Sequence, residues 1–128
     1  MTYGLSTKVA MGFTDALAAT REQLAAEGFG VLTEIDMQAT MKAKLDEDYP
    51  PLLILGACNP QFAHQAMGIT EEIATLVPCN VVVRETPDGV TVAAVDPQVL
   101  VAATNPGLAS LADQLRAKLE RALDSLAG

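Results

Sequence analysis

Hydrophobic spacing divides the first part of the chain into a strand and a helix. Residues 2–10 alternate loosely between polar and apolar side chains, which predicts a strand. A helix is expected from about residue 13 to residue 27, and Gly28 can end it in a left-handed conformation. The apolar stripe of this helix consists of Phe13, Leu17 and Leu24. We expect the stripe to lie across one face of a sheet.

A second strand and a short helix are expected next. Residues 29–35 alternate with a period of two, as in a half-buried strand. The residues expected on one face are Phe29, Val31, Thr33 and Ile35. Asp36 can then cap a helix in which Met37, Met41 and Leu45 recur every four residues, and Pro50 ends the segment. This segment is expected to be a mobile flap or an edge element.

The middle of the chain contains three further runs with the composition of strands. Residues 52–57 are continuously apolar, which predicts a strand buried on both faces. Residues 60–77 form a helical excursion. The β-branched runs at 81–85 and 90–95 are joined by Thr-Pro-Asp-Gly at 86–89, a strong signal for an antiparallel hairpin.

The C-terminal segment predicts a long amphipathic helix. Asn105 is placed to cap it and Pro106 lies in its first turn. The apolar stripe consists of Leu108, Leu111, Leu115, Leu119, Leu123 and Leu126. With 128 residues, no internal repeat and no linker, the chain is expected to form a single domain over 1–128.

Four ordered blocks of sequence carry a family resemblance. They are residues 28–36, 55–60, 78–85 and 92–97. In these blocks the chain resembles the domain of unknown function 302 family. The resemblance implies an α+β fold, β-α-β(4)-α, with an antiparallel sheet covered on one face by helices, like the TATA-box-binding-protein repeat. It also implies a tendency to form homodimers, and it implies no particular activity.

Cys58, His64 and Cys79 form the candidate functional site. If the strands that end at Cys58 and begin at Cys79 are antiparallel neighbours, the excursion between them starts and finishes at one end of the sheet. The two sulfurs would then lie close together, with His64 on the excursion. Two thiolates and an imidazole suit a zinc or copper ion, and a small-molecule ligand is an alternative occupant. The spacing is not that of a CxxC metal knuckle.

The same cysteines allow three other interpretations. Cys58 precedes Asn59 and Pro60, where a helix can begin and stabilise a thiolate, so Cys79 could act as a resolving partner in a redox pair. A thiol enzyme would use Cys58 as nucleophile and His64 as base. Alternatively, both cysteines are small packing residues and His64 is an exposed helix residue.

Several other polar and sulfur-containing residues have both a functional and a structural interpretation. Asn59 and Asn80 each follow a cysteine and could hold a ligand, although turn formation and helix capping are the usual roles of such residues. Met37, Met41 and Met67 could ligate a soft metal, whereas methionines at helical spacing are usually core residues.

Two acidic residues and one arginine are further candidates for catalysis or ligand binding. Glu34 and Asp36 are two apart on a strand, so they could work as acid and base, or form a wet face followed by a cap. Arg84 could anchor an anionic ligand, or pair with Glu34 or Glu85.

Charge and the absence of known motifs narrow the function classes. The net charge is −8, which argues against binding to nucleic acid or to anionic membranes. The N-terminus lacks the pattern of a secretory signal and no apolar run approaches about 20 residues, so a cytoplasmic protein is expected. No phosphate loop, nucleophile elbow or dinucleotide fingerprint is present, and an enzyme is the less favoured interpretation.

We therefore hypothesise a small cytoplasmic homodimer that binds a ligand at the Cys58/His64/Cys79 end of the sheet. The main rival is a structural or interaction homodimer with no chemistry of its own. In that case the sheet face and the C-terminal helix would build the dimer, and both cysteines would serve only as packing.

Overall fold

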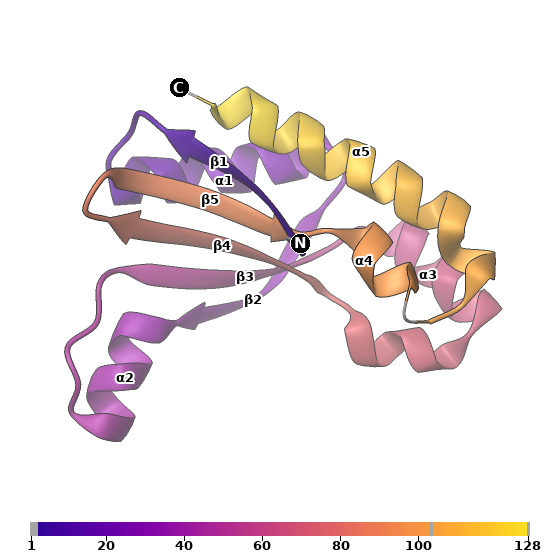
Figure 1. Ribbon diagram of the computed structural model, residues 1–128, viewed down its shortest axis with the longest axis horizontal. Coiled ribbons are helices and arrows are strands. Elements are labelled where there is room, and N and C mark those ends of the chain that lie inside the picture. The colour runs from indigo at the N-terminus through magenta and orange to yellow at the C-terminus, as the bar shows by residue number, and fades with distance from the viewer. Residues whose placement is uncertain (1–2, 103, 128) are drawn as a thin grey trace.

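A five-stranded antiparallel sheet forms the centre of the computed structural model, which describes residues 3–102 and 104–127. Every neighbouring pair of strands is antiparallel, in the order β1-β5-β4-β3-β2 (Figure 1). The strands are β1 (Gly4–Val9), β2 (Gly30–Asp36), β3 (Leu52–Cys58), β4 (Cys79–Thr86) and β5 (Gly89–Val95). The expected α+β class is confirmed. Position 2 of the expected first strand lies outside the described residues.

Two long helices cover one face of this sheet, and shorter helices occupy the connections (Figure 1). The long helices are α1 (Phe13–Ala26) and α5 (Ala109–Leu126). The short ones are α2 (Met37–Leu45), α3 (Pro60–Ile69), the 3₁₀ helix η1 (Glu71–Leu76), α4 (Pro97–Ala102) and the 3₁₀ helix η2 (Pro106–Leu108). The order β-α-β(4)-α expected from the resemblance is present, with helices added in the loops. Among the described residues, no helix combines the length and apolarity needed to cross a membrane.

The hydrophobic core lies between the sheet and the two long helices. Leu55 of β3 lies opposite Val81 of β4, and both side chains are fully buried. They belong to one cluster with Leu24 of α1 and Leu119 of α5. Burial of each such side chain contributes roughly 1.5–3 kcal/mol. The core therefore fixes α1 and α5 on the same face of the sheet.

A bulge in β2 corrects the expected alternation of residues 29–35. Val31 pairs with Ala57, but Thr33 pairs with the adjacent Gly56, so Leu32 is the extra residue. Because neighbouring residues of β3 point to opposite faces, Val31 and Thr33 do so as well. The prediction that they share a face was wrong, since a strict period of two cannot register an inserted residue.

The local signals at helix ends and turns were correct. Gly28 has a φ of 87° and follows α1, as expected for a left-handed helix end. The Asp36 carboxylate accepts a hydrogen bond from the backbone N–H of Ala39, 2.9 Å away, and so caps α2. Gly89, with a φ of 125°, closes the tight turn between β4 and β5.

The second half of the chain differs in detail from what its sequence predicts. Strand β3 is fully buried only at alternating positions and Gly56, because Leu52, Ile54 and Cys58 face the side that α1 and α5 do not cover. The helical excursion expected over 60–77 consists of two helices, α3 and η1, which the extended backbone of Thr70 separates. Helix α4 was not predicted.

The two halves of the C-terminal helix pack in different places. Its leucine stripe is present as expected. Asn105 was expected to cap this helix, but it caps the short η2 by accepting a hydrogen bond from the N–H of Gly107, and α5 begins later, at Ala109. The residues that pack in the sheet core are Leu119, Leu123 and Leu126. The first half of the stripe lies beyond the end of the sheet and forms part of a cavity. The sequence therefore extends an apolar surface past the core.

Candidate ligand site at the end of the sheet

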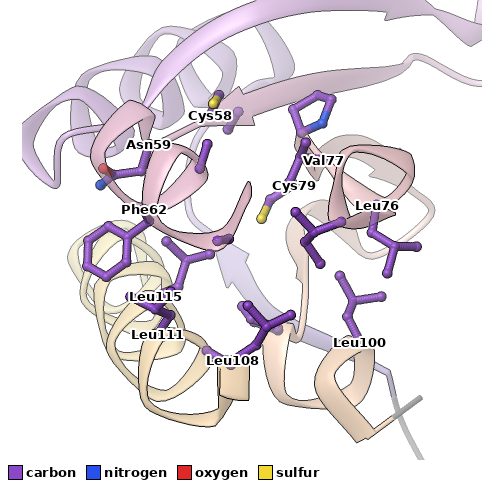
Figure 2. A pocket seen from close by; sticks show the side chains of 17 residues that line it. Cys58, Asn59, Phe62, Leu76, Val77, Cys79, Leu100, Leu108, Leu111 and Leu115 are labelled. Atoms are coloured by element: carbon purple, nitrogen blue, oxygen red, sulfur yellow. The ribbon is translucent and has the colours of Figure 1, made fainter. Parts of the chain in front are cut away.

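An apolar cavity of about 80 Å³ lies where β3 ends and β4 begins. It is partly open to the surface and is bounded by α3, η1, α4, η2 and the first half of α5 (Figure 2). Nearly all of its lining is aliphatic or aromatic. An engineered cavity of similar chemistry in another protein, about 150 Å³ in volume, stays dry and binds benzene. This site therefore suits a small apolar group better than water.

Besides η1 and α4, the helices α3 and α5 and the sheet supply the walls of the cavity. Helix α3 contributes one stripe of side chains, namely Phe62, Ala63 and Ala66. Helix α5 and the preceding turn contribute Leu108, Leu111, Ala112 and Leu115. The sheet contributes Ala57 and Cys79. Spacings of three and four residues bring the helical residues to one side of each helix.

Asn59 holds the start of α3 in place. Its side chain is buried, and its amide nitrogen donates a hydrogen bond to the carbonyl oxygen of Glu27, 3.3 Å away at the end of α1. It makes no side-chain capping bond to α3. Its role is thus to join two segments 32 residues apart, and the simple capping role considered for it is not observed.

A buried carboxylate fixes the opposite wall. Asp96 accepts a hydrogen bond from the N–H of Gln98 at 2.9 Å, at the start of α4. Its other oxygen lies 3.0 Å from the guanidinium of Arg116 in α5. Arg116 also donates to Gln98, 2.7 Å away. These bonds tie α4 to α5, and both helices line the cavity. Asp96 was not singled out from the sequence.

The two cysteines are neighbours, but they point in different directions. Cys79 pairs with Ala57, the residue before Cys58, so the excursion does leave and return at one end of the sheet as expected. Cys79 shares the buried face with Ala57, whereas Cys58 belongs to the opposite face. Figure 2 shows the Cys79 sulfur directed into the cavity and the Cys58 sulfur directed away from it. Both thiols are free, and bridging them would require the backbone to move.

The Cys79 thiol is protonated at neutral pH. Burial, and to a smaller extent the nearby Cys58, raise its pKa from the usual 9.0 to about 11. A neutral thiol is a weak nucleophile and a poor metal ligand, because both roles need the thiolate. Cys79 therefore serves the cavity as an apolar wall residue with a polarizable sulfur.

This raised pKa predicts a loss of stability in alkali. Between pH 9 and 11 the unfolded chain loses the Cys79 proton while the folded chain keeps it, so the free energy of unfolding falls as pH rises. We expect the loss to reach about 2–3 kcal/mol by pH 11. Urea unfolding at pH 8, 9, 10 and 11 measures it. A Cys79→Ala variant, which keeps every other titrating group, should lose less over that range; identical slopes would contradict the prediction.

His64 does not join the cysteines. It is exposed on α3, outside the stripe of Phe62, Ala63 and Ala66 that faces the cavity. Residues one or two positions from such a stripe lie about 100–200° around the helix, which explains its position. In residues 3–102 and 104–127, no three His, Cys, Asp or Glu side chains gather as a metal-binding group. The expected zinc or copper set of Cys58, His64 and Cys79 is therefore not formed, and no hydrogen bond pairs His64 with either described cysteine as a base.

The other acidic and basic candidates take structural positions. Glu34 forms an ion pair with Arg21 of α1, and Asp36 caps α2, so the two carboxylates serve separate partners. Asn80 is an exposed strand residue opposite Gly56. Arg84 is exposed on β4.

The three candidate methionines lie outside the main core. Met37 and Met41 lie on α2, which has no buried residue, and Met67 is exposed on α3. Their spacing is helical as predicted, but these helices lie at the ends of the sheet and away from the main core. Neither soft-metal ligation nor core packing describes their positions.

Sequence analysis missed most of the cavity lining. Phe62, Ala63 and Ala66 carry the spacing of an amphipathic helix, which was a usable signal. The first three leucines of the C-terminal stripe were predicted to be apolar contact residues, but nothing in the sequence indicated that they line a cavity. Leu76 and Leu100 carried no local signal, because only tertiary packing brings η1 and α4 together.

The fold and the cavity define a small α+β protein with an apolar pocket at one end of an antiparallel sheet. Residues 5–126 match the family described as Domain of unknown function DUF302. The chain belongs to this family. Comparison with curated proteins gives no match.

A solved structure supports the same assignment. The chain is similar to an uncharacterized conserved protein DUF302 from Bacillus stearothermophilus, with a TM-score of 0.92 and 26% sequence identity over 98% of this chain and 99% of that one.

Proposed function

We propose that the protein binds a small apolar ligand, or the apolar part of a larger one, in the cavity at the end of the sheet. The observation that supports this most strongly is the cavity itself, because ligand sites are typically concave and lined mainly by apolar side chains. Its lining offers shape and apolar contact, and among the described residues Cys79 is the only ionisable side chain directed into it. This combination favours a binding protein over an enzyme.

The excursion formed by α3 and η1 supports entry of a ligand. Helix α3 has no buried residue, and only Ile73 is buried in η1. Segments with little buried apolar surface open at low free-energy cost. The excursion can thus admit a ligand and close over it without disturbing the sheet core.

Titration with benzene, followed by NMR of the backbone amides, tests the proposed binding. We expect saturable shifts for residues of α3, η1 and the first half of α5, because these elements line the cavity. Amides of β1 and of the β4–β5 turn serve as internal controls and should stay in place. Shifts that do not saturate, or that centre on the controls, would overturn the proposal.

A second function, self-association, is supported by α2. This helix extends from the edge of the sheet (Figure 1) and has no buried residue. Leu45 is 65% exposed, and Ile35 and Tyr49 beside α2 are also exposed. Lys42, together with the acidic residues after α2, gives the same surface both signs of charge. We propose that this surface pairs with the same surface of a second copy, as in a two-fold dimer.

Light scattering at micromolar concentration measures the proposed dimer. We expect the native chain to have the mass of two copies and Leu45→Glu to have the mass of one, because the new carboxylate cannot be buried unpaired at an apolar contact. Met67→Glu changes an exposed methionine at the other end of β3 and should remain dimeric. A native chain that is already monomeric rules out this function.

A further inference from the structure

A second hollow adjoins the apolar cavity across η1. It has a volume of about 480 Å³ and lies between η1 and residues 104–106. Ile73 and Leu76 line both hollows, so a single layer of side chains separates them. Ile73 is buried and Leu76 is half-buried. Movement of the half-buried Leu76 side chain would join the two hollows, because this residue lies in the layer between them.

The two hollows have opposite chemistry. Apart from Ile73, Leu76 and Pro106, the second is lined by polar side chains: Thr70, Glu72, Thr75, Thr104 and Asn105. The side-chain amide oxygen of Asn105 accepts a hydrogen bond from the N–H of Gly107, and the Thr75 hydroxyl donates to the backbone carbonyl oxygen of Glu72. The lining thus offers hydrogen-bonding groups next to a cavity that offers almost none.

Glu72 is the ionisable residue of this polar hollow. It is exposed, and no basic side chain of the described residues forms a salt bridge with it. The whole chain carries a net charge of −8, which also favours cations over anions. The charge of the polar hollow is therefore complementary to a positive group.

From these observations we propose that the ligand is a small amphipathic cation, with an apolar group in the cavity and an ammonium-type head beside Glu72. This inference rests on the proposed function and adds the class of ligand. The apolar group provides contact with α3 and α5, and the head exchanges water for the carboxylate and neighbouring hydroxyls. An anionic head of the same size would meet Glu72 with like charge.

Three probes with one alkyl chain test the role of the head: n-butylamine as its cation, n-butanol, and butyrate. Their dissociation constants are measured by NMR titration at pH 7 and low salt. We expect the amine to bind about three- to fivefold more tightly than the alcohol, as exposed ion pairs allow, and butyrate to bind most weakly. Glu72→Gln should remove the amine's advantage without changing the affinity for butanol.

Glu71→Gln is the matched control, because Glu71 precedes Glu72 on η1 and does not line the polar hollow. It should keep most of the preference for the amine. If butanol binds in the cavity but the amine has no advantage, the ligand class is wrong and the apolar site stands. If none of the three probes binds in the cavity, both proposals are overturned.

Discussion

Replacement of Gly56 by alanine is expected to destabilise the fold by about 3 kcal/mol, the upper part of the usual range for overpacking. A Cβ atom on Gly56 would overlap the hydroxyl oxygen of Thr33 and lie 2.8 Å from Cγ of Pro78. The Thr33 hydroxyl can retreat only by leaving its present rotamer, and the Pro78 ring is bonded to its own backbone, so the strands must shift to make room. Urea denaturation at pH 7 measures the change.

Gly68→Ala is the control for this substitution. A Cβ at Gly68 meets nothing within 4 Å, and the residue lies inside α3. Alanine there should be neutral or stabilise the protein by up to about 1 kcal/mol, because it favours the helix. In a Gly56→Ala background, Thr33→Ala should recover part of the loss. A Gly56→Ala variant as stable as the native chain would show that β2 and β3 do not approach as described.

The second large effect is expected from filling the cavity. Ala112 lies on α5, is 5% exposed and lines the cavity. Leucine at this position would project into the space that the ligand is proposed to occupy. We expect Ala112→Leu to weaken benzene binding at least about tenfold, which corresponds to about 1.4 kcal/mol. Calorimetry or NMR titration measures the affinity.

Ala117→Leu provides the matched comparison, because Ala117 is an exposed residue of the same helix. It should bind benzene like the native chain. Unfolding curves of both variants show whether α5 still packs on the sheet, so that lost binding is separated from lost structure. Unchanged affinity in a folded Ala112→Leu protein would mean that benzene binds elsewhere.

The parts of the fold that could be predicted are those set by local sequence. The Thr-Pro-Asp-Gly turn, the left-handed Gly28 and the Asp36 cap each depend on a few adjacent residues. The register of β2 could not be predicted, because the bulge at Leu32 is fixed by pairing with Ala57 and Gly56 of β3, which are distant in the sequence. Local pattern therefore identified the strand and failed on which face its residues occupy.

The sequence correctly predicted that the excursion starts and finishes at one end of the sheet, but it did not predict which side chains meet there. Antiparallel pairing placed the ends of the excursion together, as the positions of Cys58 and Cys79 indicated. Whether His64 faces the site depends on the rotation of α3 about its own axis. The apolar stripe of α3 faces the cavity, so His64 points away from it. Cysteine and histidine indicate a site because they are reactive residues. The cavity is built mainly from alanine and leucine, which occur throughout protein cores and so give no such signal.

A crystal of the native protein held under xenon pressure gives the most direct test of the binding cavity. Xenon occupies dry apolar cavities, and its electron density is easily recognised. The account predicts a strong xenon peak among Cys79, Phe62 and Leu115, between α3 and α5. A cavity filled instead by ordered water molecules, with no xenon, would contradict it.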